Sequence, residues 1–200
     1  GLARAHRISY VGELGWELYV SADMAGHVFE SIDEAGQDLG LKMCGLHVLD
    51  SCRIEKAFRH FGHDITDEDN VLEAGLGFAV KRDKDSGKFG DFIGRKAVMD
   101  TRERGLQRRM LQFKLSDSKA MVYHNEPIIR DGKIVSFLTS GNYGHTLGAS
   151  IGMGYVPVID GEKGADQLLS SYEIEIAGQR IAAEVSLKPM YDPTSERVRA

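Results

Sequence analysis

The chain has 200 residues, with 25 lysines and arginines against 30 aspartates and glutamates, so its net charge is −5. Its length suits one large domain or two small ones, and its 42% apolar and 28% charged residues are typical of a globular protein. This composition argues against intrinsic disorder and collagen-like structure, and the acidic balance disfavours a generally basic nucleic-acid-binding surface. No run approaches the roughly 20 apolar residues of a membrane helix. We therefore expect neither a nucleic acid nor a membrane as a partner.

The first 58 residues predict a hairpin followed by two helices. Residues 4–20 indicate a β-hairpin, because side chains alternate from Trp16 to Val20 and residues 12–15 supply a glycine-rich turn. Ser21 is placed to cap a helix that ends at Gly40. A second helix is expected over residues 46–58, with Leu46, Leu49, Ile54, Ala57 and Phe58 on or near its buried face.

Residues 60–100 indicate loops with short regular elements between them. Residues 76–80 suit a strand, residues 82–88 a solvated turn, and residues 93–98 the start of a short helix. We place a domain boundary near Gly105, which divides the chain into residues 1–104 and 105–200.

The rest of the chain shows β-type patterns. Short apolar strands flank Asp131-Gly132, a strong signal for a type I′ hairpin, and the pattern repeats around Ala177-Gly178. Several short strands separated by turns predict a small barrel or sandwich.

The two cysteines, Cys44 and Cys52, are not placed to form a disulfide. In a helix, eight residues separate them by about 12 Å, whereas a disulfide needs Cα atoms within about 7 Å. We predict two buried, non-catalytic thiols in a reducing compartment, which is the cytoplasm or, in a eukaryote, the mitochondrial matrix.

Glu17 is the most informative single residue, because an acidic side chain is disfavoured in the middle of a strand. One interpretation is an outward-facing carboxylate paired across the hairpin with Arg7. The other is a carboxylate that reads a ligand, because its two acceptor oxygens match two adjacent N–H donors, as in a 2-amino-4-oxo pterin. Tyr10 lies across the predicted turn, where its ring either flanks a flat ligand or packs within the hairpin.

A histidine-containing segment and a glycine-rich segment resemble functional motifs but lack their full pattern. His60, His63 and Asp64 have a short, ligand-like spacing, but a zinc site needs a third or fourth ligand and none pairs with them convincingly. We interpret this segment as a loop held by side-chain hydrogen bonds and predict no metal. The glycines of residues 148–154 do not form the GxGxxG dinucleotide motif, and close approach of strands explains them better.

For the remaining serines, histidines and arginines, structural roles are also the better interpretation. The serines and histidines show no nucleophile signature such as GxSxG. The arginines at positions 102, 104, 108 and 109 suit either a phosphate or polyglutamate contact or, as we prefer, a solvated boundary segment.

Residues 8–18, ISYVGELGWEL, resemble the folate-site hairpin of the glycine-cleavage T-protein (aminomethyltransferase) family. Further segments resemble the same family in the same order, and the likeness covers nearly the whole chain: residues 45–55, 61–65, 72–77, 93–95, 138–141 and 153–156. Residues 143–148 and 189–193 resemble, more narrowly, the T-protein-like part of dimethylglycine and sarcosine dehydrogenases or oxidases.

The resemblance implies an α+β fold: the remainder of a T-protein-like folate-binding domain over residues 1–104, then a small antiparallel β-barrel over residues 105–200. It also implies that tetrahydrofolate is the ligand and that Glu17 binds its pterin, with Tyr10, Leu18 and Tyr19 beside it.

In such enzymes a flavin domain oxidises a small methylated amine, and the T-protein-like region passes the one-carbon unit to tetrahydrofolate. The resemblance therefore implies an N-terminal domain in cis that binds FAD, outside these 200 residues. The family's general-base aspartate also belongs to a stretch that would precede Gly1. We expect this chain to be a C-terminal fragment that is inactive alone and holds no catalytic residue.

Three functional alternatives remain at this point. Leu49 stands where ordinary T-proteins tend to carry an arginine, which favours the dehydrogenase-like branch. A fragment of an aminomethyltransferase or of another folate-dependent demethylase is the second interpretation. A non-catalytic folate-binding module is the third.

Overall fold

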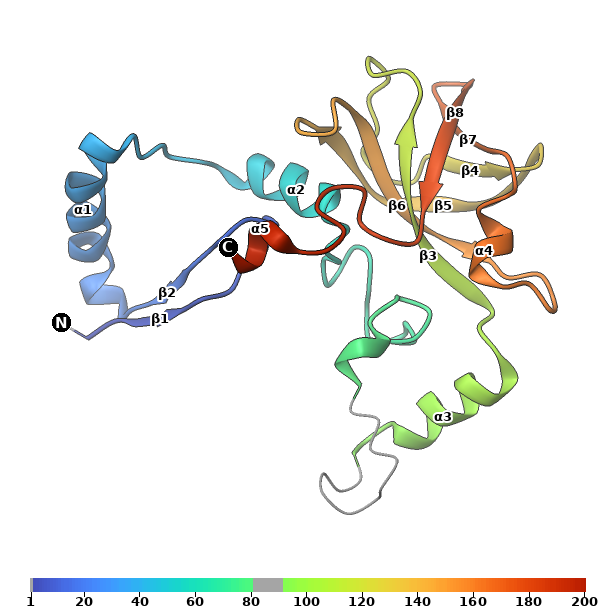
Figure 1. Ribbon diagram of the computed structural model, residues 1–200, viewed down its shortest axis with the longest axis horizontal. Helices are drawn as coiled ribbons and strands as arrows, with labels where there is room; N and C mark the ends of the chain where they lie inside the picture. The colour runs from blue at the N-terminus through green and yellow to red at the C-terminus, as the bar shows by residue number, and fades with distance from the viewer. Residues whose placement is uncertain (1, 81–91) are drawn as a thin grey trace.

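The computed structural model describes residues 2–80 and 92–200. Helices and a small hairpin occupy the N-terminal part, and a β-barrel occupies the C-terminal part (Figure 1). This arrangement confirms the predicted α+β class with a C-terminal antiparallel barrel.

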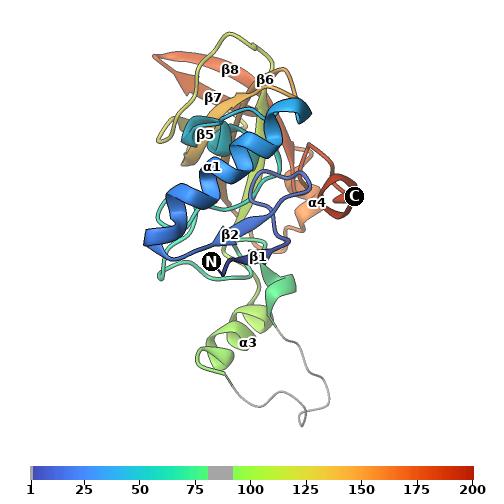
Figure 2. The same cartoon turned by 90° about the vertical axis from the view of Figure 1, so that its left-hand side faces the viewer.

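The N-terminal hairpin and the helix after it are both present, although the strands are shorter than the predicted ones and the Ser21 side chain makes no capping hydrogen bond. Strands β1 (Arg4–His6) and β2 (Glu17–Tyr19) pair antiparallel. Ser21 precedes the 3-10 helix η1 (Ala22–Met24), which leads into α1 (Ala25–Gly36) and η2 (Gln37–Leu39). Gly40 ends this helical run with φ of +75°, a conformation that favours glycine. Figure 2 shows α1 crossing this side of the molecule, with the hairpin beside its N-terminal end.

Helix α2 (Leu46–Glu55) ends three residues before the predicted Phe58. The Phe58 amide donates to the Arg53 carbonyl, and the Ala57 amide to that of Ile54. These paired bonds with Ala57 at φ of +52° form a Schellman motif, which terminates a helix. Ile54 and Ala57 are buried as predicted, but Leu46 is 82% exposed, because the first turn of α2 extends away from the barrel.

The segment between α2 and the barrel is mostly irregular. The strand expected over residues 76–80 is wrong, because a local bond from the Ala79 amide to the Leu76 carbonyl forms the 3-10 helix η3 (Gly77–Ala79). The turn predicted at residues 82–88 lies outside the described residues. The predicted helix is present as α3 (Arg95–Arg104), bounded by Gly94 and Gly105.

Six antiparallel strands form a closed barrel in the order β3-β6-β5-β4-β7-β8. Their bounds are β3 (Arg108–Leu115), β4 (Pro127–Arg130), β5 (Lys133–Gly144), β6 (Ala149–Pro157), β7 (Tyr172–Ile176) and β8 (Gln179–Ser186). Helix α4 (Gly164–Gln167) lies between β6 and β7, and α5 (Glu196–Arg199) follows β8.

Two predicted turns close the barrel's hairpins. Asp131-Gly132 and Ala177-Gly178 each have two successive positive φ angles, at 49° and 80° and at 49° and 78°. This is the type I′ geometry, whose twist matches that of the flanking strands.

The core has two clusters. One fills the barrel and includes Phe113, Ile128 and Leu138. The other joins Ile54 of α2 to the outer side of β3 and β6 at Met110 and Met153. The second cluster fixes α2 on the barrel, so the N-terminal part is supported where α2 ends.

The prediction for the cysteines is half wrong. Both are free thiols, but Cys44 is exposed, because it lies in an exposed stretch, residues 41–48, that includes the first turn of α2. Cys52 is partly buried, and this burial raises the pKa of its thiol.

Candidate functional site

The register of the hairpin decides which side chains share a face. His6 stands opposite Glu17, and Ala5 stands opposite Leu18. Because successive side chains point to opposite faces of a strand, Glu17 and Tyr19 lie on one face together with His6. Leu18, which the sequence groups with them, lies on the other face.

The Glu17 carboxylate is exposed and held in place. The Tyr19 hydroxyl donates to Glu17 Oε2 at 2.7 Å, and this bond raises the pKa of the tyrosine. Within the described part of the chain no donor is bonded to Glu17 Oε1. The His6 and Tyr19 rings are 5.0 Å apart. The result is an oriented carboxylate with acceptor capacity remaining, beside two rings.

His6 is a neighbour that the sequence did not indicate. A turn at residues 12–15 would place Glu17 opposite Tyr10, but the connection is the longer stretch of residues 7–16. The register is therefore four residues away from the one that the glycine pattern suggests. The pairing of Glu17 with Arg7, one of the two interpretations of Glu17, is wrong, because Arg7 donates instead to the backbone carbonyl of Ala200.

Tyr10 is fixed against the segment that follows α2. Its hydroxyl donates to the Arg59 carbonyl at 3.0 Å, and its ring stacks on Phe58 with centroids 6.2 Å apart. Burial raises the pKa of this tyrosine. The structure thus places Tyr10 in the same hairpin as Glu17 but not directly across from it.

A buried polar cluster supports this region from the barrel side. Arg53 of α2 contacts the Asp64 carboxylate at 2.5 Å and the Ser140 hydroxyl at 2.8 Å. Thr139 Oγ1 donates to the other Asp64 oxygen. Three of the family-like segments therefore converge on one network, which links α2, the loop of residues 60–65 and β5.

This network also explains the loop that contains His60, His63 and Asp64. Asp64 accepts from Arg53, from Thr139 and from the His60 amide, so its oxygens are already committed to hydrogen bonds. Over residues 2–80 and 92–200, no three histidine, cysteine, aspartate or glutamate side chains are grouped to hold a metal ion.

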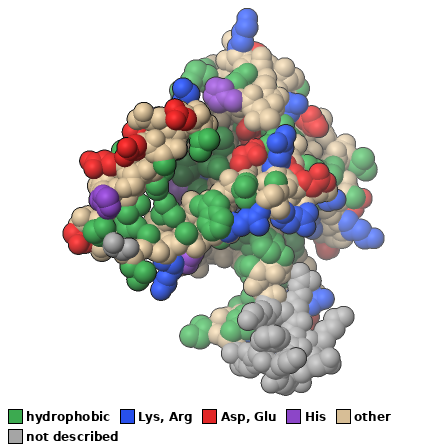
Figure 3. Space-filling view, turned by 60° about the vertical axis from the view of Figure 1, so that its left-hand side comes forward, with side chains coloured by type: hydrophobic (Ala, Val, Ile, Leu, Met, Phe, Trp, Pro, Cys, Tyr) green, Lys and Arg blue, Asp and Glu red, His purple; other side chains and the backbone are tan. Residues whose placement is uncertain are grey.

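Hydrophobic side chains are exposed around the hairpin and α1. Figure 3 shows a hollow on this side, with hydrophobic side chains around it. The exposed large side chains of this region include Ile8, Leu14, Trp16, Leu18, Tyr19, Phe29, Ile32, Leu39, Leu41, Met43, Leu46 and Val48. A helix with the apolar spacing of α1 is expected to bury that stripe, so the exposed stripe is suited to face another part of a larger structure.

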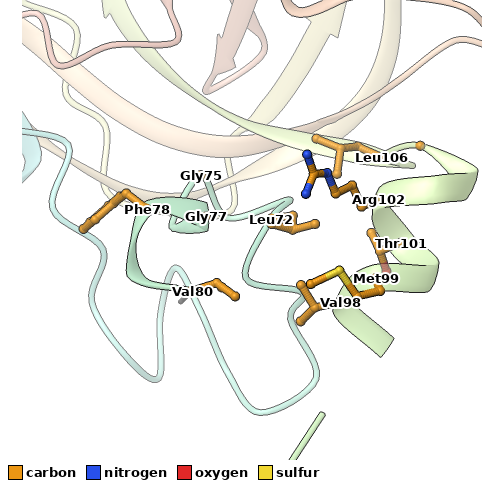
Figure 4. A pocket seen from close by; sticks show the side chains of 11 residues that line it. Leu72, Gly75, Gly77, Phe78, Val80, Val98, Met99, Thr101, Arg102 and Leu106 are labelled. Carbon is orange, nitrogen blue, oxygen red and sulfur yellow. The ribbon is translucent and has the colours of Figure 1, made fainter. Parts of the chain in front are cut away.

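A separate cavity of about 450 Å³ lies between the segment around η3 and helix α3 (Figure 4). Leu72, Val98 and Met99 give it a largely apolar lining, and Arg102 stands at its edge. Among the described residues that line it there is no carboxylate to match adjacent N–H donors, so the hairpin is the better candidate site.

The four arginines of residues 102–109 do not form one anion-binding patch. Arg102 lines the cavity, while Arg108 is neutralised by Asp69 at 2.6 Å and Glu73 at 3.0 Å. Arg109 donates to the Gln167 side chain at 2.6 Å. Arg108 and Arg109 belong to barrel strand β3, so the prediction of one solvated segment is wrong for them.

The fold and this hairpin are those of the T-protein family. Residues 2–84 match the GCVT N-terminal domain, and residues 108–192 match the glycine cleavage T-protein C-terminal barrel domain. The chain belongs to this family, and it is also similar to proteins named dimethylglycine dehydrogenase and sarcosine dehydrogenase. The division into domains at residue 104 remains a prediction.

The similar proteins are enzymes that are longer than this chain. A 4-methylaminobutanoate oxidase (formaldehyde-forming) of Paenarthrobacter nicotinovorans is 43% identical over 100% of this chain and 23% of its own length. Human mitochondrial dimethylglycine dehydrogenase is 36% identical over 98% of the chain and 22% of its own length. An aminomethyltransferase of Halothermothrix orenii is 44% identical over 75% of the chain and 40% of its own length.

A solved structure shows the same arrangement. The glycine cleavage system aminomethyltransferase T of Bartonella henselae superposes with a TM-score of 0.80 at 25% identity, covering 96% of this chain and 50% of that one. The chain thus spans between about a fifth and a half of the proteins it matches. None of the helices in the described ranges is both long enough and apolar enough to cross a membrane.

Proposed function

We propose that this chain forms the pterin-binding part of a tetrahydrofolate-dependent one-carbon transfer region, within a longer N-demethylating enzyme of the dimethylglycine or sarcosine dehydrogenase type. The observation that carries the proposal is the Glu17 carboxylate, which is exposed, held by Tyr19 and open to donors at Oε1.

The chemistry of this group fits a pterin. The 2-amino group and the adjacent ring N–H of a 2-amino-4-oxo pterin are parallel donors, and an ionised carboxylate accepts two such bonds. Tyr10 and Tyr19 supply aromatic surface in the same hairpin, which suits a flat ring system. In this proposal Glu17 and Tyr19 orient the pterin and Tyr10 fixes the loop beside it, while Leu18 lies on the opposite face of the hairpin.

The proposed substrate class is a small methylated amine. The relatives named for 4-methylaminobutanoate, dimethylglycine and sarcosine support this class. When bound, tetrahydrofolate accepts the one-carbon unit released by demethylation. The residues of this chain bind and orient the folate, and we assign none of them to the chemical step.

Part of the proposal concerns the longer protein. We infer an FAD-binding domain in cis, since the dehydrogenase and oxidase relatives extend far beyond the matched region. The compartment that fits best is the cytoplasm or the mitochondrial matrix, and several relatives are named as mitochondrial.

The first test is Glu17→Gln in the complete native polypeptide. This change puts an amide donor where the pterin also presents donors, so we expect tetrahydrofolate to bind at least about tenfold more weakly. Isothermal titration calorimetry measures the affinity, with Glu30→Gln on exposed helix α1 as the matched control. Unchanged affinity in Glu17→Gln would contradict the assignment.

A stand-alone aminomethyltransferase is the second candidate, favoured by the similarity to the Halothermothrix orenii and Bartonella henselae proteins. Intact mass and flavin absorbance of the native protein separate the two. A polypeptide several times larger than 22.1 kDa that carries flavin supports the dehydrogenase type. A polypeptide about twice this size without flavin supports the aminomethyltransferase.

A further inference from the structure

The hairpin that carries Glu17 is too small to be rigid alone. β1 and β2 have three residues each, and isolated two-stranded ribbons are marginally stable in water. Its apolar side chains Trp16 and Leu18 are 60% and 45% exposed, so packing on this face supports it little. The orientation of Glu17 therefore depends on what holds residues 7–16.

The segment of residues 189–200 lies against this loop. After the barrel, the chain runs back past α2 toward the hairpin, and α5 lies between hairpin and barrel (Figure 1). The Tyr191 hydroxyl donates to the Glu13 carboxylate, which raises the pKa of this tyrosine. Glu13 precedes Glu17 by four residues, so the contact is made on the connection that leads directly into β2.

The buried side chain of Lys56 packs against the same loop, residues 7–16. Lys56 is 1% exposed, and a Cβ on Gly12 would lie 3.0 Å from Lys56 Cβ. Gly12 also has φ of +80°, a conformation that favours glycine. Both this conformation and the close approach to Lys56 exclude a side chain at position 12.

The charge of Lys56 is compensated from the C-terminal segment. Lys56 Nζ contacts Asp192 Oδ2 at 2.7 Å, and the hydrogen bond from Lys56 lowers the pKa of this carboxyl. The amides of Glu196 and Arg197 donate to the Asp192 carboxylate at 2.8 Å and 3.2 Å. Asp192 thus joins the start of α5 to the lysine under Gly12.

The attachment continues into the barrel. The Met190 amide donates to Gln112 Oε1 at 2.8 Å, and Gln112 Nε2 donates to the Ile54 carbonyl at 2.6 Å. Gln112 is 2% exposed on strand β3. The C-terminal segment is therefore fixed to the barrel and α2 on one side and to the hairpin loop on the other.

We propose that Tyr191 and Asp192 are positioning residues for folate: residues 189–200 form a strap that holds loop 7–16 and so sets the orientation of Glu17. Tyr191 acts through Glu13, and Asp192 acts through Lys56 and Gly12. The proposal rests on the proposed function, because it assigns the strap to the affinity of the pterin site.

The test is Tyr191→Phe in the complete native polypeptide, which removes one hydroxyl and leaves the ring. Because a single hydrogen bond contributes modestly, we expect the Kd and KM for tetrahydrofolate to rise between about two- and tenfold. The KM for the amine and kcat at saturating folate should stay unchanged. Hydrogen–deuterium exchange of residues 7–16 should accelerate, while that of the barrel stays as it was.

Companion variants separate this role from a general loss of stability. Glu13→Gln keeps an acceptor and should bind folate nearly as the native protein does, whereas Glu13→Ala should match Tyr191→Phe. Adding Glu13→Ala to Tyr191→Phe should cause no further loss of folate affinity, because both variants remove the same hydrogen bond. Tyr123→Phe, on an exposed barrel loop, is the control that should leave folate affinity unchanged.

The strap is overturned if Tyr191→Phe leaves both folate affinity and exchange at residues 7–16 unchanged. Additive losses from Glu13→Ala and Tyr191→Phe would also overturn it. Failure of the strap is distinct from failure of the proposed function. If Glu17→Gln weakens folate binding and Tyr191→Phe does not, only the strap is wrong. If Glu17→Gln has no effect, the pterin assignment itself fails.

Discussion

At the residue scale, Gly154 of β6 shows how closely the strands approach. A Cβ at this position would lie 2.6 Å from Ile128 Cδ1 and 2.8 Å from the Phe137 carbonyl oxygen. The Phe137 oxygen is backbone, so the clash cannot be relieved by turning a side chain. This is the close approach that the glycine-rich sequence of residues 148–154 predicted.

We expect Gly154→Ala to lower the free energy of unfolding by about 1–3 kcal/mol, the usual cost of overpacking. Thermal or chemical denaturation of the purified variant measures it. Gly26→Ala is the control, because Gly26 lies in α1 with nothing within 4 Å of the added methyl. That change should be neutral or stabilise by up to about 1 kcal/mol. Equal midpoints for the two variants would contradict the packing argument.

Individual residues were predictable where chemistry alone marks them. Glu17 stands out in the sequence because an acid is unusual in the middle of a strand, but in the structure it is the exposed first residue of β2. His6 carries no such mark, since its place opposite Glu17 depends on a register that a ten-residue connection leaves open. Leu46 and Cys44 were expected to be buried, but burial depends on which surfaces meet, and this end of α2 meets none among the described residues.

At the element scale, Ala177 occupies a strained position in the β7–β8 turn. It has φ of +49° without being glycine, and the left-handed region costs an alanine about 1–2 kcal/mol. Asparagine tolerates this region better, and Asn-Gly is the preferred type I′ pair. We expect Ala177→Asn to raise stability by about 0.5–1 kcal/mol, as measured by the thermal unfolding midpoint. A lower midpoint would show that the positive φ of Ala177 is not a source of instability.

The ion pair between Arg130 and Glu162 should make stability depend on pH. The hydrogen bond from Arg130 holds the pKa of the Glu162 carboxyl below its usual range, and the two side chains are 7% and 9% exposed. As pH falls, the unfolded chain takes up this proton before the folded chain does. The pair's contribution is therefore complete above the ordinary glutamate pKa of about 4.3 and is lost as pH falls through the folded value.

The measurement compares native protein with Glu162→Gln across pH. We expect the native protein to have the higher unfolding midpoint at pH 7 and the difference to shrink below about pH 4. Glu184→Gln serves as the control, because Glu184 is exposed on the barrel and far in sequence from both Arg130 and Glu162. It should change the unfolding midpoint little. A constant difference from pH 7 to pH 3 would show that the loss in Glu162→Gln is not electrostatic.

Elements with local signals were predictable, and those decided by tertiary contacts were not. Helices α1 and α3 and the two type I′ turns have boundary glycines or turn residues in the sequence itself. The short apolar run at residues 76–80 has no such mark and forms a 3-10 helix. The strand order of the barrel is also not local, because β3 pairs with β6 and β8 across long stretches of chain.

At the scale of the whole molecule, the contrast between the two parts is the main feature. The barrel has a closed sheet with a filled interior, whereas α1 leaves large apolar side chains such as Phe29 and Ile32 exposed. The Bartonella henselae structure matches this chain over only half of its own length. An apolar face of this kind is expected where a further part of the T-protein fold would pack.

Hydrogen bonds connect the barrel and the segment after it to the N-terminal part of the molecule. Barrel strand β5 bonds to α2 through Ser140 and Arg53, and the C-terminal segment bonds to the hairpin through Tyr191 and Glu13. The barrel thus serves as the fixed body that holds the candidate pterin hairpin at a distance from its own core.

The most direct measurement is a crystal structure of the complete native polypeptide with tetrahydrofolate bound. We expect the pterin's 2-amino group and adjacent ring N–H to donate to the Glu17 carboxylate, at about 2.7–3.2 Å. We also expect Tyr191 to remain bonded to Glu13. A pterin seated elsewhere, for example in the cavity between η3 and α3, with Glu17 facing solvent, would contradict the account.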